Sequence, residues 1–246
     1  MATKKNHSAP YITHLELVHE RVPSPDTFPY TLPAIRQLTV LPFHPRVTFL
    51  VGENGSGKST LLEAIAVAHG LNAEGGSRNF NFETRASHSK LGEWIRVWKN
   101  FSSHDAYFLR AESFYNVATE IERLGVGGVY GDRSLHEMSH GEAFFAVFEK
   151  RFGGAGLYLL DEPEAALSPQ RQLQFLALLH DYVQAGSQFI IATHSPIIMA
   201  YPQAKIYHFE ATGLREIAYT DTEHYRITRA FLNHPQTMLD ELCRPS

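Results

Sequence analysis

The chain has almost no cysteine, no long apolar run and no excess of positive charge. Its 246 residues include one cysteine, Cys243, which excludes a framework of disulfides within the chain and fits a reducing cytosol. The longest apolar run, FIIATHSPIIMA (189–200), is interrupted by His194 and Pro196 and is too short to span a bilayer. No apolar segment follows the lysines near the N-terminus, so we expect no signal peptide and no membrane insertion.

The charge balance does not indicate a polyanionic partner. Formal net charge is −4, from 22 basic and 26 acidic residues, and nucleic-acid or membrane-surface binding is usually accompanied by a basic excess. A local basic patch would still permit nucleic-acid binding. With 43% hydrophobic and 20% charged residues, the composition is that of an ordinary globular protein with a sizeable core.

Apolar strands alternate with amphipathic helices along the chain. We expect strands at 11–18, 37–43, 46–51, 106–112, 156–164 and 187–193, helices at 61–70, 91–99, from 139 onward and 170–183, and a hairpin formed by 205–210 and 214–219. Several of these strands are continuously apolar, as is typical of strands that are buried on both faces. The alternation therefore predicts an α/β fold with a mostly parallel sheet.

A phosphate-binding loop follows the predicted strand 46–51. Residues 52–59 match G-x-x-x-x-G-K-[ST] and open a predicted helix, which is the context this motif requires. Its glycines let backbone N–H groups point at phosphate oxygens, Lys58 would bridge the β- and γ-phosphates, and Ser59 would bind Mg²⁺. The candidate ATP ligands are Gly52, Glu53, Asn54, Gly55, Ser56, Gly57, Lys58, Ser59 and Thr60.

The stretch SLHEMSHGEAFF (134–145) has two competing interpretations. His136, Glu137 and His140 spell H-E-x-x-H, which binds zinc when both histidines lie on one helical face. However, Ser139 and Glu142 form the S-x-x-E pattern of a capping box, which places the helix start at Ser139 and leaves His136 in the preceding loop. We therefore expect no zinc site here.

Four motifs in order resemble those of an ATP-binding cassette ATPase. They are GENGSGKST (52–60), MSHGE (138–142), LYLLDEPEAALS (157–168) and ATHSP (192–196). Ser139 precedes Asp161 by 22 residues, and Asp161 precedes His194 by 33, both typical of that family. The resemblance implies a P-loop NTPase fold that adds an antiparallel β part and a small helical lobe to the mostly parallel sheet.

The resemblance also implies roles for individual residues. Asp161 would hold Mg²⁺ together with Ser59, and Glu162 would be the general base for the attacking water. His194 would be the switch histidine that contacts the γ-phosphate. Ser139 and Gly141 would face the γ-phosphate bound by a second subunit, so that two ATPs are sandwiched in a head-to-tail dimer.

The sequence departs from the transporter pattern at several positions. His140 replaces the usual glycine of the signature, and Glu142 replaces the usual glutamine, as in the chromosome-maintenance and DNA-repair branch. Glu112 is the best positional candidate for the glutamine that senses a membrane subunit. Lys58 and Ser139 are only 81 residues apart, with no heptads, so we expect no coiled-coil arm. The adenine-stacking aromatic residue stays open among Tyr11, Tyr30 and Phe43.

These observations predict a single cassette domain over residues 1–246, with a helical lobe inserted at roughly 85–150. We expect a cytoplasmic Mg-ATP hydrolase that dimerises around ATP and works with an unidentified protein partner. Two alternatives remain: the motor subunit of a membrane transporter, and a nucleotide-sensing module with little turnover. Glu142 and the absent glutamine argue against the first, and the Asp161–Glu162 pair argues against the second.

Overall fold

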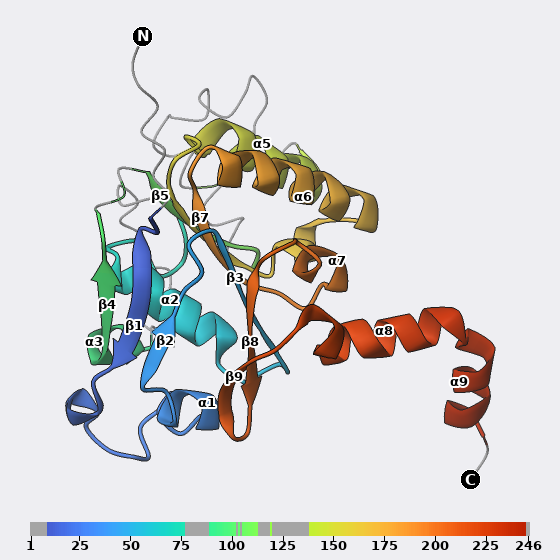
Figure 1. The fold of residues 1–246 in the computed structure, drawn as a ribbon, viewed down its shortest axis with the longest axis horizontal. Helices are drawn as coiled ribbons and strands as arrows, with labels where there is room; N and C mark the ends of the chain where they lie inside the picture. The colour runs from blue at the N-terminus through green and yellow to red at the C-terminus, as the bar shows by residue number, and fades with distance from the viewer. Residues whose placement is uncertain are drawn as a thin grey trace.

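A six-stranded, mostly parallel sheet forms the centre of the protein (Figure 1). The structure is a computed structural model that describes residues 9–76, 89–101, 103, 105–112, 119 and 138–244, of which His140 is described by its backbone only. The strand order is β5-β6-β7-β3-β8-β9, and only the last pair is antiparallel. The strands are β3 (Val47–Gly52), β5 (Ala106–Arg110), β6 (Leu157–Asp161), β7 (Gln188–Ala192), β8 (Lys205–Glu210) and β9 (Gly213–Glu216).

Every residue of β3, β6 and β7 is buried, because both faces of the sheet are covered. One face carries α5 (His140–Arg151), α6 (Pro169–Gln184) and α7 (Pro196–Met199). On this face Phe148 of α5 packs its ring edge-on against Phe175 of α6, with ring centroids 5.2 Å apart. The buried side chains of α5 are Ala143, Phe144, Val147 and Phe148, whose helical spacing places them on one face of that helix.

The other face is covered by α2 (Lys58–Ala68) and a small antiparallel sheet. That sheet has the order β2-β1-β4 and consists of β1 (Ile12–Leu17), β2 (Val40–Pro42) and β4 (Ile95–Lys99). The shorter elements around it are η1 (His19–Arg21), α1 (Pro33–Arg36) and α3 (Leu91–Trp94). The α/β class with a mainly parallel sheet is confirmed.

The expected helix over 91–99 was wrong. Only α3, a single turn, is helical, and the chain then continues as β4, which pairs antiparallel with β1. Leu91 and Trp94 have a helical spacing, whereas Ile95 and Val97 alternate with polar residues, so the short run fits both periods. The β-branched residues follow their strand preference once β1 offers an edge.

The chain ends in an arm formed by α8 (Glu223–Asn233) and α9 (Pro235–Leu242), which follows the short turn η5 (Tyr219–Asp221). Figure 1 shows the arm projecting from the body near α7. Neither arm helix has a buried residue, and Leu232 and Leu242 are 71% and 75% exposed. The expected lobe at 85–150 includes residues 113–118 and 120–137, which lie outside the described residues.

Candidate functional site

The phosphate loop joins the carboxyl end of β3 to the first turn of α2. Its three glycines have φ values of +141° (Gly52), +77° (Gly55) and +104° (Gly57), which other residues rarely adopt. A Cβ atom on Gly52 would lie 2.8 Å from the carbonyl oxygen of Phe209. The remaining predicted ligands of the loop, Glu53, Asn54, Ser56 and Thr60, lie on the loop or on the first turn of α2.

Lys58 is buried beneath this loop, with 4% of its surface exposed. Its ammonium group donates to the carbonyl oxygens of Gly52 (2.7 Å) and Glu53 (2.8 Å). Burial lowers the pKa of Lys58, and the nearby carboxylates of Glu162 and Asp161 oppose that change. The loop thus folds around a cation that donates two hydrogen bonds to the loop itself, in the place where phosphate oxygens would accept from it.

Ser59 and Asp161 are 102 residues apart in the chain and meet at the loop. The Ser59 hydroxyl donates to Asp161 Oδ1 at 2.9 Å, and the end of β6 places the carboxylate there. Arg110, at the end of β5 and in register with Asp161, has its Nε 3.3 Å from Asp161 Oδ2. Burial raises the pKa of Asp161 to about 6, although Arg110 and the Ser59 hydroxyl oppose the rise.

This pair suits a magnesium ion. A hydroxyl and a carboxylate are hard oxygen ligands, and Mg²⁺ binds few protein groups together with substrate phosphates. The raised pKa of Asp161 reflects a buried charge that is incompletely compensated, and a divalent cation would stabilise that charge. The donor chemistry therefore fits Mg²⁺ at Ser59 and Asp161.

Glu162 follows Asp161 with an unusual backbone conformation, φ +50° and ψ +52°. Its N–H donates to the carbonyl oxygen of Ala192 at 2.9 Å, which ties the turn after β6 to the end of β7. The side chain is 44% exposed, and its Oε1 lies 3.7 Å from His194 Nε2. The left-handed turn therefore directs the carboxylate away from the sheet and toward the predicted switch histidine.

His194 lies in the switch loop, which we define as residues 193–196; it follows β7 and ends at the first residue of α7. The backbone N–H of His194 donates to Glu164 Oε1 at 2.5 Å, and the Thr193 hydroxyl donates to Glu164 Oε2 at 2.8 Å. The ring contacts His224 in α8, with 2.9 Å between His194 Nδ1 and His224 Nε2. Burial, then the charge of Lys58, lowers the pKa of His194.

The sequence motifs assigned no role in the ATP site to Arg110, Glu164 or His224. Arg110 could have been found, because a charged residue that ends an apolar strand beside the Asp161 strand lies at the same sheet edge. Glu164 lies in the LYLLDEPEAALS motif (157–168), but the sequence does not indicate which group its carboxylate bonds to. The sequence alone gave no signal for His224, whose contact with His194 depends on where the arm starts.

The signature segment begins α5 with the predicted capping box. Ser139 is the N-cap (φ −62°, ψ 154°), its backbone N–H donates to Glu142 Oε2 at 2.9 Å, and its Oγ accepts from the Glu142 N–H at 3.4 Å. The extended backbone of Ser139 breaks any continuous helix from 136 to 140, which the zinc motif requires. Within the part of the chain that the structure describes, no three His, Cys, Asp or Glu side chains are grouped to hold a metal.

The Ser139 hydroxyl is engaged within its own cap, since it donates to Glu142 Oε2 at 2.7 Å. Gly141 is packed closely, and a Cβ there would lie 3.0 Å from Arg171 Cδ and 3.1 Å from the carbonyl oxygen of Ala166. The signature turn is thereby held against η4 (Pro163–Ala166) and the start of α6. His136 and Glu137 lie outside the described residues.

Two of the aromatic candidates for adenine stacking are core residues. Tyr11 and Phe43 are 8% and 6% exposed and belong to the core between α2 and the small sheet. A ring enclosed in this way cannot present its face to a base. Tyr30 is partly exposed, and its hydroxyl is 3.1 Å from His19 Nδ1.

Glu112, the positional candidate for the glutamine that senses a membrane subunit, has an 86% exposed side chain, 3.7 Å from Arg110.

A glycine-rich loop after a central parallel strand, with a buried lysine, a serine and an acidic pair on the next strands, defines a P-loop nucleoside triphosphatase. Within that class, residues 31–150 match an AAA domain family, and residues 130–200 match a second AAA domain family whose description also names the AbiEii toxin of a Type IV TA system.

Two curated relatives are ATP-binding proteins. The cytochrome c biogenesis ATP-binding export protein CcmA of Mesorhizobium japonicum is 31% identical over 165 residues, which are 60% of this chain and 78% of the relative. The hemin import ATP-binding protein HmuV of Roseobacter denitrificans is 30% identical over 179 residues, which are 60% of this chain and 64% of the relative. This chain thus spans less than two thirds of the second relative.

A solved structure of a metal-chelate type ABC transporter in an inward-facing conformation shares the fold, with a TM-score of 0.51 and 16% identity over 89% of this chain and 88% of that one. The similarity to the first curated relative shows that the chain belongs to the ATP-binding cassette family of P-loop ATPases: it binds ATP and hydrolyses it. Across the described residues, none of the helices combines the length and apolar character needed to cross a bilayer.

Proposed function

We propose that this chain is a cytoplasmic Mg-ATPase of one cassette domain that dimerises head to tail around two ATPs. The observation that carries the proposal is the meeting of Ser59, Asp161, Glu162 and His194 at the mouth of the phosphate loop. These side chains come from three separate segments and supply a cation site, a carboxylate base and a γ-phosphate donor.

In this mechanism Lys58 and the backbone N–H groups of 52–60 hold the phosphates, and Lys58 exchanges its bonds to Gly52 and Glu53 for phosphate oxygens. Mg²⁺, when held by Ser59 and Asp161, would offset the negative charge that builds on the β- and γ-phosphates. Glu162 accepts the proton of the attacking water as the water oxygen bonds to the γ-phosphorus and the bond from that phosphorus to the β–γ bridging oxygen breaks, which releases phosphate and ADP. His194 donates to a γ-phosphate oxygen.

The dimer supplies the other side of each ATP. Ser139 and Gly141 of one subunit would face the γ-phosphate held by the other, with the N-terminus of α5 favouring the anion. The Ser139 hydroxyl would have to exchange its bond to Glu142 for one to the phosphate. The contact between the Ser139 hydroxyl and phosphate would therefore form only when ATP is bound.

The phosphate loop is tested by Lys58→Ala. We expect the Kd for Mg-ATP, measured by calorimetry, to rise by at least tenfold, equivalent to about 1.4 kcal/mol, and steady-state phosphate release to be lost. Lys150→Ala is the matched control, because Lys150 is an exposed lysine in the last turn of α5. If Lys58→Ala binds ATP as the wild type does, the assigned role of this loop is wrong.

The motor subunit of a membrane transporter is the second candidate. It is favoured by the names of the curated relatives, which are import and export ATP-binding proteins. Affinity capture of Glu162→Gln protein with Mg-ATP separates the two candidates: recovery of an integral membrane protein in stoichiometric amount supports the transporter, and recovery of a homodimer alone supports the stand-alone ATPase.

A further inference from the structure

The switch histidine is in contact with a second histidine that no part of the mechanism above uses. His194 Nδ1 and His224 Nε2 are 2.9 Å apart, and the two rings meet edge to face with centroids 4.9 Å apart. Among the described residues, His194 Nε2 and His224 Nδ1 make no hydrogen bond, although both atoms are buried. The two rings therefore share one hydrogen bond, and each ring has a second nitrogen with no hydrogen bond to the described residues.

Only one proton can lie between the two facing nitrogens. Both rings favour the neutral form, since burial and then the charge of Lys58 lower the pKa of each, and a neutral imidazole carries one N–H. For His194 to donate to a γ-phosphate, that N–H must be on Nε2, which leaves Nδ1 as an acceptor. His224 must then be the donor, through Nε2–H.

The first turn of α8 is anchored independently of this contact. Thr222 is fully buried, and its hydroxyl accepts from the Tyr225 N–H at 3.3 Å while donating to the carbonyl oxygen of Tyr219 at 2.8 Å. The Tyr219 hydroxyl in turn donates to the carbonyl oxygen of Pro196, in the switch loop, at 2.8 Å. His224 therefore reaches His194 from a turn that is already attached to the switch loop.

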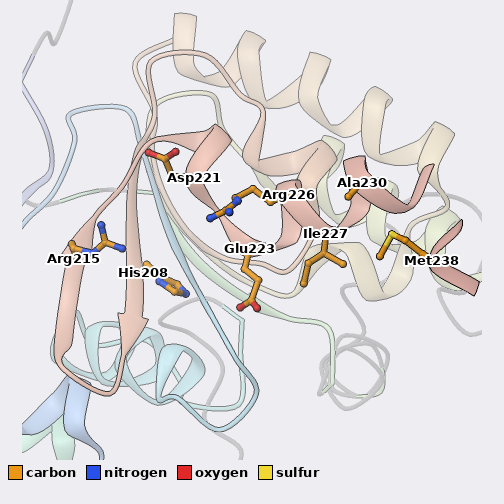
Figure 2. A pocket seen from close by; sticks show the side chains of 8 residues that line it. All are labelled: His208, Arg215, Asp221, Glu223, Arg226, Ile227, Ala230 and Met238. Carbon is orange, nitrogen blue, oxygen red and sulfur yellow. The ribbon is translucent and has the colours of Figure 1, made fainter. Parts of the chain in front are cut away.

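The His224 ring contacts the switch loop through His194. An adjacent side of α8 faces a cavity of about 600 Å³ between the β8–β9 hairpin and the arm. Figure 2 shows His208 and Arg215 of the hairpin on one side of that cavity and Glu223, Arg226 and Ile227 of α8 on the other. His224 is not among the residues that line it.

We propose that His224 is a positioning residue for ATP hydrolysis: its Nε2–H holds His194 in the Nε2–H tautomer and aims that N–H at the γ-phosphate. The inference rests on the proposed role of His194. The direction agrees with the 3.7 Å separation between His194 Nε2 and Glu162 Oε1, because the free N–H lies on the side of the attacking water.

The tautomer can be measured in the wild-type protein. Two-dimensional ¹H–¹⁵N spectra of protein labelled at its 14 histidines, with His194 assigned from His194→Gln, should show a protonated Nε2 and an unprotonated, hydrogen-bonded Nδ1. A protonated Nδ1 on His194 overturns the inference without any variant of His224.

Two substitutions then test the donor. A glutamine places an N–H at the position of His224 Nε2, so His224→Gln should keep kcat within about threefold, whereas His224→Leu should lower kcat by about tenfold or more, with ATP affinity unchanged. Tyr219→Phe is the control, because it removes a bond that anchors the turn and leaves the ring pair in place; its kcat should match the wild type.

The outcomes separate the inference from the proposed function. If Lys58→Ala and His194→Ala keep wild-type turnover, the proposed site itself fails. If both lose turnover but His224→Leu hydrolyses ATP at the wild-type rate, only the role of His224 fails. If His224→Gln is as slow as His224→Leu, the donated hydrogen bond is not what His224 contributes, and the inference is likewise overturned.

Discussion

Glu162 holds a conformation that favours the reaction at the expense of stability. Its φ of +50° lies in the left-handed region, which costs a residue with a Cβ roughly 1 kcal/mol. Asparagine tolerates this region better than glutamate does. We therefore expect Glu162→Asn to raise the free energy of unfolding by about 0.5–1 kcal/mol in denaturant titrations while abolishing phosphate release.

Glu162→Gln is the matched control for that measurement. It removes the same carboxylate, but glutamine has no added preference for the left-handed region, so turnover should be lost without a gain in stability. Equal stabilisation by both substitutions would attribute the effect to the lost charge rather than to the backbone.

Protonation of His194 would abolish the hydrogen-bond arrangement derived above. A second proton places an N–H on Nδ1, where it meets the N–H of His224. Burial, followed by the charge of Lys58, lowers the pKa of His194, while Glu162 and Glu53 oppose the shift. The neutral form is thus retained to a lower pH than in an ordinary histidine, and the midpoint of the acid limb of kcat should lie below 6.5.

The acid limb is measured from kcat at saturating Mg-ATP. His224→Gln should keep the limb, because the titrating ring is His194 and glutamine does not titrate. A midpoint above 6.5 in the wild-type protein would contradict this account. The free energy of unfolding should also decrease as the pH falls. Both rings have lowered pKa values in the folded protein, so the unfolded chain takes up protons at these two histidines more readily than the folded protein does.

At the scale of elements, the parts of the site that could be predicted are those that end an apolar strand. The phosphate loop follows β3, Asp161 ends β6 and His194 follows β7, and the carboxyl ends of parallel strands share one edge of the sheet. The apolar runs therefore predicted where these strands end, and the resemblance to the cassette motifs assigned Ser59, Asp161 and His194 to one site.

The parts that could not be predicted depend on partners distant in sequence. The segment 95–99 becomes a strand because β1 pairs with it, and its own residues fit a helix nearly as well. The contact between His194 and His224 requires the path of the chain from β9 through η5, which no local pattern encodes. Arg110 is intermediate: its place at a strand end was visible, but its ion pair with Asp161 was not.

At the scale of the whole molecule, the body and the arm meet at the switch loop. The ring pair His194–His224 and the bond from Tyr219 to Pro196 join the loop to the first turn of α8. Beyond that turn the arm helices have no buried residue and extend from the body (Figure 1). The proposed hydrolytic site thus contacts, through His194, the first turn of an arm whose two helices have no buried residue.

The proposed sandwich dimer predicts that the molecular mass of the protein in solution depends on ATP. In the proposed sandwich each ATP contacts a signature turn from a second subunit, so the dimer should form with ATP and dissociate on hydrolysis. Glu162→Gln should bind ATP without cleaving it, and light scattering after size exclusion with Mg-ATP should give twice the 27.7 kDa of the monomer. Without nucleotide the same variant should elute as a monomer.

The control is the double variant Lys58→Ala, Glu162→Gln in the same buffer, which should stay monomeric because it cannot hold the phosphates. Ser139→Arg in the Glu162→Gln background should also stay monomeric, since a long cation would replace the capping hydroxyl at the proposed contact with the partner's nucleotide. A monomer at saturating Mg-ATP, or a dimer that forms equally well in the double variant, would contradict the sandwich, because only ATP-dependent pairing requires the signature turn to face a second subunit.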